Sequence, residues 1–319
     1  MVGAERKVVL VALGGNAILQ PGQRGTVKQQ RLNIRSTTDQ LAEMVLSGEY
    51  EMVISHGNGP QVGNILLQNE LARESVPQMP LDVCGAQSQG LIGYMIARSL
   101  RNTFVRHDRE DISIASILTQ TVVEKGDPAF DNPTKPVGRY YSEKEAQQLK
   151  QEKGYDMMEV EDNKYRRVVP SPEPLRITER PAVAQLLRSG TVVIAGGGGG
   201  VPVVEKDGQL RGVEAVIDKD LASAQLAWDL GADSFLILTN VDHVYLNYGT
   251  ENQHPLSELT IAEARNYLEQ GQFGEGSMKP KVEAGIRFLE NGGSKVVITS
   301  LKQATAALTE GEGTRITPS

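Results

Sequence analysis

The feature that most constrains the fold is a glycine-rich turn between a strand pattern and a helix pattern. The sequence HGNGPQVG at residues 56–63 follows an apolar run at residues 52–54 and precedes a helical pattern. Glycines let the backbone approach a ligand closely, and the first turn of a helix directs free N–H groups and the positive end of its dipole at that ligand. Similar turns follow apolar runs at residues 14–16 and 196–200. Three such turns predict a cleft whose backbone binds phosphate groups.

Short β-branched runs alternate with longer helical patterns along the chain. Strands are predicted at residues 8–13, 52–55, 112–118, 191–195, 234–238 and 295–299. Helices are predicted at residues 34–45, 62–73, 87–101, 179–187, 218–230, 261–269 and 281–290. This alternation predicts an α/β fold in which a mainly parallel sheet is covered on both faces. Ligands then bind at the carboxyl ends of the strands.

Composition excludes several classes of protein. The 319 residues carry a net charge of -7, which argues against a general nucleic-acid surface. A single cysteine and four histidines exclude a disulfide framework within the chain and make a zinc cluster improbable. No apolar run approaches the length of a membrane span. We therefore expect a cytoplasmic enzyme without a membrane or nucleic-acid partner.

Residues 121–174 interrupt the alternation of strands and helices. The segment is rich in proline and in charged residues such as the run at residues 143–145. A long polar excursion inside an α/β chain is usually a lid or a disordered insert. Its four tyrosines and the apolar pair Val168 and Val169 favour an ordered lid subdomain.

Two further stretches deliver lysines to predicted helix starts. Asp218, Lys219 and Asp220 precede an apolar helix pattern, and residues 273–281 form a glycine-rich loop that ends at Lys281. Helix capping accounts for the aspartates, but a cation in the first turn opposes the helix dipole. Lys219 therefore indicates a nearby anion, whereas a solvated basic loop remains an alternative for the second stretch.

Several familiar motifs are excluded. The chain has no Gly-Lys dipeptide for a P-loop, its glycines have the wrong spacing for a dinucleotide fingerprint, and protein-kinase signatures are missing. Residues 86–90 imitate the nucleophile elbow of hydrolases, but no strand precedes them, which favours a closely packed helix start. His56 is interpreted as a hydrogen-bonded structural residue, since it stands beside a glycine turn. Cys84 is interpreted as a packing residue, because no basic partner adjoins it.

Taken in order, the motifs resemble those of the carbamate kinases, which are members of the amino acid kinase family. The matching stretches span nearly the whole chain and are residues 12–17, 56–63, 82–90, 132–136, 169–172, 196–200, 216–220 and 276–281. The resemblance implies a three-layer α/β/α sandwich that forms one domain over residues 1–319. Within it, residues 1–190 would form the phosphoryl-acceptor lobe with the lid at about 121–174, and residues 191–319 the nucleotide-binding lobe. It also implies a homodimer.

The resemblance further implies a reaction and a set of site residues. The reaction is reversible phosphoryl transfer between ATP and carbamate, used in arginine catabolism to make ATP from ADP and carbamoyl phosphate, with Mg²⁺ as cofactor. The implied catalytic residues are Lys135, Lys219, Asp220 and Lys281, and Asp220 would also help to hold Mg²⁺. The implied phosphate- and substrate-binding residues are Gly14, Gly15, Asn16, Gly57, Asn58 and Gly59. Nucleotide binding is implied for Gly198, Thr239, Asp242, Tyr245, Gly276, Ser277 and Met278.

Two alternatives stay open at this stage. One is another amino acid kinase, acting on acetylglutamate or a nucleoside monophosphate, although such relatives carry a first-strand lysine that residues 11–13 do not supply. The other is a non-catalytic sensor of nucleotide or carbamoyl phosphate, although a pure binder does not need so many lysines at one phosphoryl group. The chain also departs from the carbamate kinase pattern at residues 161–165, which leaves the shape of that loop open.

Overall fold

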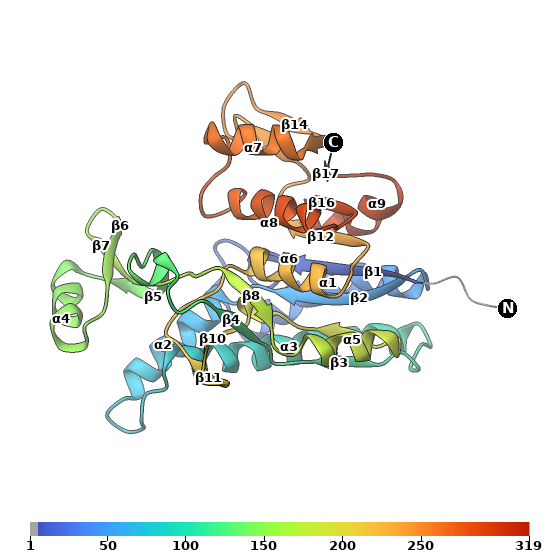
Figure 1. Cartoon of the computed structure of the whole chain (residues 1–319). Coiled ribbons are helices and arrows are strands. Elements are labelled where there is room, and N and C mark those ends of the chain that lie inside the picture. The colour runs from blue at the N-terminus through green and yellow to red at the C-terminus, as the bar shows by residue number, and fades with distance from the viewer. Residues whose placement is uncertain (1–5, 319) are drawn as a thin grey trace.

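The chain is built around one eight-stranded sheet (Figure 1). The computed structural model describes residues 6–318. The strand order across the sheet is β15, β17, β16, β12, β1, β2, β9, β3, and every neighbouring pair is parallel except β16 with β17. The strands are β1 (Lys7–Leu13), β2 (Tyr50–His56), β3 (Ile114–Ser116), β9 (Val192–Ile194), β12 (Ser234–Thr239), β15 (Glu258–Thr260), β16 (Lys295–Ser300) and β17 (Thr314–Thr317).

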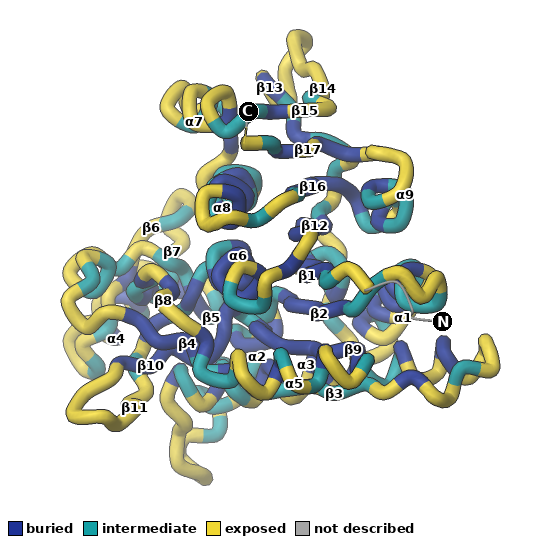
Figure 2. The backbone as a smooth tube through the Cα atoms, turned by 45° about the vertical axis from the view of Figure 1, so that its right-hand side comes forward, coloured by how far each residue is buried: buried dark blue, intermediate teal, exposed yellow. Residues whose placement is uncertain are grey.

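Both faces of the sheet are buried, as the period-two alternation of strand side chains requires. In β1, Val9 and Val11 contribute to one apolar core, while Leu10 and Ala12 contribute to the other. Figure 2 shows the central strands as a buried layer between more exposed helices. Burial on two faces explains why these strands read as continuous apolar runs in the sequence.

Helices cover the two faces in separate groups. One core includes side chains from α1 (Val27–Leu46), α3 (Leu81–Arg106) and α9 (Ala304–Thr309). The other includes side chains from α5 (Arg180–Arg188), α6 (Lys219–Asp229), α7 (Ile261–Glu269) and α8 (Lys279–Glu290). The predicted α/β fold with a mainly parallel, doubly covered sheet is therefore confirmed.

Helix ends follow local chemistry. Helix α1 begins after Thr26, whose side chain accepts a hydrogen bond from the Gln29 backbone N–H while the Gln29 side chain accepts one from Thr26. It ends just before Gly48, whose positive φ of 77° suits the position after a helix. Ser88 lies inside α3, which runs unbroken through residues 86–90, so these residues form no nucleophile elbow.

The element boundaries differ from prediction in a few places. All six predicted strands occur, but the one expected at 112–118 is only three residues long because its pairing with β9 covers residues 114–116. Strands β15 and β17 were not predicted, since they are three and four residues long and β15 finds its partner more than fifty residues later. No residue within 6–318 belongs to a helix long and apolar enough to cross a membrane.

A smaller sheet lies beside the main one and carries the lid. Its strand order is β11, β10, β4, β8, from β4 (Gln120–Val123), β8 (Pro174–Ile177), β10 (Val201–Lys206) and β11 (Gln209–Gly212). Between β4 and β8 the chain leaves this sheet after a short turn, η2 (Pro128–Phe130), and protrudes from the molecule (Figure 1).

The protruding unit is an antiparallel sheet with one helix. It contains β5 (Lys135–Tyr141), β6 (Met157–Glu161), β7 (Lys164–Val169) and α4 (Glu143–Lys153). Tyr141, Ala146, Leu149 and Met157 form its own small apolar core. The segment 161–165, where the sequence departs from the carbamate kinase pattern, is the exposed tip of the β6–β7 hairpin, with Asn163 at a positive φ of 57°. A second hairpin, β13 (Val244–Leu246) with β14 (His254–Leu256), follows β12.

Candidate active site

The glycine-rich turns meet because the strands that precede them are neighbours in the sheet. Leu13 at the end of β1 pairs with His56 of β2 on one side and with Leu238 of β12 on the other. The backbone N–H of Gly57 donates to the Leu13 carbonyl oxygen at 3.2 Å, and that of Gly14 donates to the Leu238 carbonyl oxygen at 2.9 Å. Parallel strands place their carboxyl ends at one edge, so these turns share a site.

Close packing explains two of the glycines. A Cβ on Gly14 would lie 2.9 Å from the Leu238 carbonyl oxygen, and a Cβ on Gly198 would lie 2.2 Å from the side-chain nitrogen of Asn58. Gly198 also has a positive φ of 62° in the turn η3 (Gly197–Gly199). Side chains at these positions would force the turns apart.

Asn58 joins two of the elements around the turns. It precedes helix α2 (Gly59–Ala72), and its side-chain amide donates to Ser88 Oγ of α3 at 2.7 Å. Gly57 stands close to Gly15 and Lys219, because a Cβ on it would lie 3.8 Å from the Gly15 nitrogen and from Lys219 Cδ. Gly15 and Asn16 themselves begin the short turn η1 (Gly15–Ala17). Backbone from β1, β2 and η3 thus meets the start of α6.

Two lysines share one carboxylate beside these turns. Lys219 Nζ donates to Asp220 Oδ1 at 2.5 Å, and Lys281 Nζ donates to Asp220 Oδ2 at 3.1 Å. The Asp218 side chain caps α6 by accepting from the backbone N–H groups of Asp220 and Leu221, which sets the direction of the lysine and aspartate side chains. Lys281 comes from the first turn of α8 and also donates to the Ser277 carbonyl oxygen at 3.1 Å. We call these three residues the Lys–Asp–Lys cluster.

Burial and charge oppose each other in this cluster. The side chains of Lys219, Asp220 and Lys281 are only 13%, 5% and 11% exposed. Burial lowers the pKa of Lys219, while the Asp220 charge opposes that shift and the Lys281 charge adds to it. For Asp220, burial favours the protonated form, but the two ammonium groups outweigh it and the pKa is lowered. Asp220 therefore stays a carboxylate at neutral pH.

The lid supplies a third lysine. Lys135, the first residue of β5, donates to Asp218 Oδ2 at 3.0 Å. Its side chain is 42% exposed, in contrast to the buried cluster. Asp218 thus connects the lid to the start of α6 through one carboxylate. Three lysine charges against those of Asp218 and Asp220 leave this part of the site with an excess of one positive charge, which suits an anionic ligand.

An open cavity of about 600 Å³ lies between the lid and the sheet edge. The predicted site residues that line it are Gly57, Asn58, Gly59, Lys135, Gly198, Lys219, Asp220, Gly276 and Lys281. Gly15 adjoins this group through Gly57, and Ser277 does so through Lys281, whereas Gly14 lies against Leu238 and Thr239. The structure therefore gathers all four predicted catalytic residues at a single cavity.

The remaining predicted nucleotide residues lie between the end of β12 and β13 and just before α8. Thr239 is the last residue of β12, and a Cβ on Gly14 would lie 3.7 Å from the Thr239 Cα. Met278 directly precedes α8. Asp242 accepts from Thr299 Oγ1 through its backbone carbonyl at 3.0 Å, and Tyr245 lies in β13 with its ring against Tyr248. Asp242 and Tyr245 do not line the cavity described above.

His56 has a structural environment. Its side chain is buried, and its Nδ1 donates to the Gly57 carbonyl oxygen at 3.0 Å, since a carbonyl oxygen can only accept. Burial lowers its pKa to about 4, and the Lys219 charge adds to that shift. The imidazole is therefore neutral at physiological pH. Cys84 is likewise buried in an apolar cluster, and burial raises the pKa of its thiol.

Sequence reasoning missed several charged residues of the cavity. Asp218 was interpreted only as a helix cap, although it also binds Lys135. Arg24 and Arg166 line the cavity as well, and Arg166 donates to the Gly138 carbonyl oxygen at 2.9 Å. The only sequence signal for Arg166 was its place just before the proline-rich end of the lid.

The side chains of the site offer few ligands for a metal ion. Residues 6–318 contain no group of three or more His, Cys, Asp or Glu side chains that could hold a metal ion. Asp220 directs each carboxylate oxygen at a lysine. Mg²⁺ keeps several waters and is commonly held by one or two carboxylates together with substrate phosphates. The site therefore fits an ion that arrives with the phosphates of a nucleotide, and it does not fit an ion held by protein side chains alone.

Comparison with known families gives the class of the protein. Residues 7–300 match the model of the amino acid kinase family. The chain belongs to the amino acid kinase family.

Individual relatives show which members of the amino acid kinase family this chain is most similar to among those compared. The carbamate kinase of Thermococcus kodakarensis is 49% identical over 312 residues, which cover 97% of this chain and 99% of the relative. The carbamate kinase of Halobacterium salinarum is 49% identical over 97% of this chain and 98% of its own. The structure of carbamate kinase from Giardia lamblia bound to AMP-PNP superposes with a TM-score of 0.93 at 41% identity, covering 98% of both chains. Within the family the chain groups with the carbamate kinases, which are phosphotransferase enzymes.

Proposed function

We propose that the protein catalyses reversible phosphoryl transfer between ATP and carbamate, and that it mainly makes ATP from ADP and carbamoyl phosphate. The observation that carries the proposal is the Lys–Asp–Lys cluster facing Lys135 across one cavity. Phosphoryl transfer depends on positioning and on neutralising the charge that spreads over the oxygens of the transferring group. Relatives at 49% identity over nearly the whole chain carry the name of this activity.

The reaction balances without a protein nucleophile. In one direction a carbamate oxygen attacks the γ-phosphorus of ATP and the bond between that phosphorus and the bridging oxygen of ADP breaks. In the other, a β-phosphate oxygen of ADP attacks the phosphorus of carbamoyl phosphate, and the bond between that phosphorus and the carbamoyl oxygen breaks, which releases carbamate. Carbamate is already anionic, so no group needs to remove a proton. The neutral, buried His56 agrees with this chemistry.

Each group of residues has a proposed part in this transfer. Lys219 and Lys281, oriented by Asp220, neutralise charge on the transferring phosphoryl group from the sheet side, and Lys135 does so from the lid. The N–H groups of Gly14 and Gly57 are bonded to strand carbonyls, so the backbone N–H groups that follow them in the two turns would contact the phosphoryl group and the carbamoyl end. Gly198 packs against Asn58, so we assign it to the support of the acceptor turn.

The nucleotide completes the proposed site. Thr239, Asp242, Tyr245, Gly276, Ser277 and Met278 bind ATP or ADP in this proposal, and Mg²⁺ accompanies the nucleotide phosphates with Asp220 nearby. Bound Mg²⁺ supplies further charge neutralisation. The Giardia lamblia relative solved with AMP-PNP supports a nucleotide ligand for this fold.

The test is ATP formation from ADP, Mg²⁺ and carbamoyl phosphate, with acetyl phosphate as the competing donor. We expect rapid turnover with carbamoyl phosphate, slower turnover with acetyl phosphate, and a loss of about 100-fold in the Lys135→Ala variant. A preference for acetyl phosphate would assign another acceptor. ADP binding without any turnover would favour a sensor.

A homodimer and a cytoplasmic location belong to the same proposal. The outer surface of α3 exposes Leu91 and Tyr94 by 41% and 55%, and β3 ends the sheet beside it. An exposed sheet edge next to apolar side chains suits a second copy of the chain. Light scattering should report the mass of a dimer, and Tyr94→Asp should shift it towards the monomer.

A further inference from the structure

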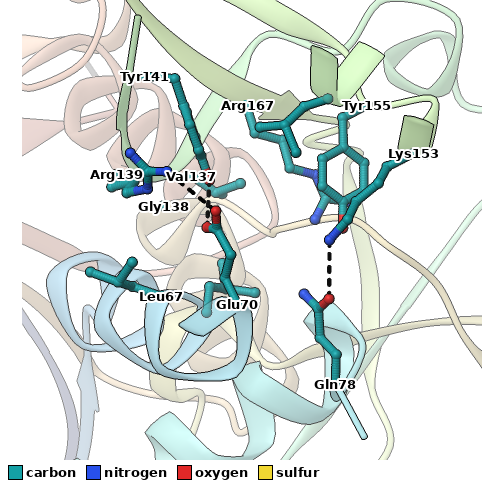
Figure 3. Close-up of a pocket in the computed structure, with 12 residues that line it drawn as sticks. Leu67, Glu70, Gln78, Val137, Gly138, Arg139, Tyr141, Lys153, Tyr155 and Arg167 are labelled. Atoms are coloured by element: carbon teal, nitrogen blue, oxygen red, sulfur yellow. Dashed lines mark hydrogen bonds and ion pairs between the residues drawn. The ribbon is translucent and has the colours of Figure 1, made fainter. Parts of the chain in front are cut away.

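The lid is attached to α2 by a compact set of polar contacts (Figure 3). A cavity of only about 20 Å³ remains between α2 and the protruding unit. Glu70 of α2 points from the helix towards β5, where Arg139 and Tyr141 point back at it. Because so little space is left, the lid and α2 are in direct contact there.

Both carboxylate oxygens of Glu70 accept hydrogen bonds from the lid. Oε1 accepts from an Arg139 guanidinium nitrogen at 3.3 Å, and Oε2 accepts from the Tyr141 hydroxyl at 3.0 Å. The Glu70 side chain is 20% exposed, so water screens these bonds only in part. The Arg139 guanidinium lies over the Tyr141 ring, 4.2 Å from its centroid, and also binds Glu145 at 3.1 Å. One carboxylate therefore holds two residues of a single lid strand.

The contact lies on the same strand as Lys135. Lys135 begins β5, and Arg139 and Tyr141 end it. The register of β5 against β7 shifts between Val137 and Tyr141, where Gly138 has a positive φ of 73°. Gly138 lies close to Gly63 of α2, because a Cβ on Gly63 would lie 3.7 Å from the Gly138 Cα. A bulge in β5 thus brings Arg139 against α2.

Helix α2 also begins at the proposed acceptor turn. Its first residue, Gly59, lines the large cavity, and Glu70 lies three turns further along the same helix. An α-helix of this length is a stiff connection between its ends. Movement of the lid strand away from Glu70 would change the place of Lys135 relative to the turn at residues 57–59.

We propose that Glu70 is a positioning residue for the phosphoryl transfer: through Arg139 and Tyr141 it latches the lid so that Lys135 reaches the cavity. This inference rests on the proposed function, because it assumes that Lys135 acts on the transferring group. The lid makes further polar contacts: the exposed Lys153 donates to Gln78 at 3.2 Å, and Arg167 donates to Glu214. On β5 itself, Lys135 donates to Asp218 at the opposite end of the strand from the Glu70 contact.

The test compares Glu70→Gln with Glu74→Gln. Both remove one negative charge near the end of α2, but Glu74 is exposed and has no hydrogen bond or ion pair within residues 6–318. We expect Glu70→Gln to lower kcat/KM for carbamoyl phosphate about tenfold, within the range of a lost hydrogen bond to a charged group, and to leave the KM for ADP unchanged. Tyr141→Phe should cause a smaller loss, of about threefold.

A second pair of measurements separates positioning from a general effect on the fold. In a Lys135→Ala background, Glu70→Gln should cause little further loss, because the latch then has no lysine to place. Amide hydrogen exchange of residues 135–141 should be faster in Glu70→Gln than in Glu74→Gln without any substrate.

Each outcome has a defined meaning. Equal kinetics and equal hydrogen exchange in Glu70→Gln and Glu74→Gln would overturn the proposed latch. It would also be overturned if the double variant lost activity by the product of the two single losses. If the wild-type protein makes no ATP, the proposed function fails, while the exchange comparison still reports whether Glu70 holds the lid.

Discussion

The cavity carries two kinds of lysine–aspartate pairing that differ in what holds them. The Lys–Asp–Lys cluster is buried and comes from α6 and α8, which pack on the main core. The Lys135–Asp218 pair is 42% exposed on its lysine side and depends on a protruding unit with its own small core. The same charges thus serve one cavity from a buried side and from a partly exposed side. Four substitutions test this difference.

The largest effect is expected at Asp220. Asp220→Asn leaves two buried ammonium groups without a carboxylate, so the free energy of unfolding should fall by about 3 kcal/mol and ATP formation by about 10²–10³-fold. Denaturant unfolding and initial rates measure the two. Asp229→Asn at the other end of α6 is the matched control and should preserve the rate. An Asp220→Asn protein of normal stability would show that the cluster is not held as a buried unit.

Lys135→Ala should separate activity from stability. The rate of ATP formation is expected to fall about 100-fold, while the free energy of unfolding changes by less than about 1 kcal/mol, because the pair is partly solvated. The same two assays apply. A large loss of stability would remove the contrast between the lid side and the buried side.

Lowering the pH should reduce the free energy of unfolding, because the buried His56 must become protonated. Its pKa is about 4 in the folded protein, below its ordinary value, so the unfolded chain binds one more proton as pH falls from 6.5 towards 4. The stability due to the neutral imidazole is present above pH 6.5 and is lost across that window, by up to about 3 kcal/mol. Urea unfolding between pH 7 and pH 4 measures it. His56→Gln should flatten the slope, and His254→Gln on an exposed hairpin should not.

The smallest effect is expected at the lid tip. Lys164 pairs with Glu161 on the β6–β7 hairpin, and both side chains are more than half exposed. Lys164→Ala should leave both the rate of ATP formation and the unfolding midpoint within experimental error. A clear loss of rate would mean that the tip, where the sequence departs from the carbamate kinase pattern, contacts a substrate.

The sequence predicted the main sheet well because its strands are buried on both faces and read as apolar runs. The second sheet was not predicted, since β4, β8 and β11 are each four residues long and β4 finds its partners across more than fifty residues. Strands β15 and β17 were missed because they too are short. Helix α4 lies in a polar segment whose few buried positions give a weak apolar pattern.

Site chemistry was predictable only in part. Lys219 was noticed because a cation opposes the helix dipole, but its sharing of Asp220 with Lys281 joins positions 61 residues apart, which no local pattern reveals. The contact of Gly198 with Asn58 likewise joins distant positions, and the predicted nucleotide contact of Gly198 stays a prediction. The contact between Glu70 and Arg139 could not be predicted, because it depends on a bulge in β5.

Strand order has a consequence for the path of folding. β17 lies between β16 and β15, so the strand latest in sequence fills a gap inside the sheet. β15 pairs with no strand of the main sheet except β17, and it cannot join until residues 314–317 have left the ribosome. The lobe proposed to bind nucleotide is therefore completed only after residues 314–317 have been synthesised. Until then the edge of β16 stays open, and a nascent chain stalled before residue 314 should be recognised by chaperones as unfinished.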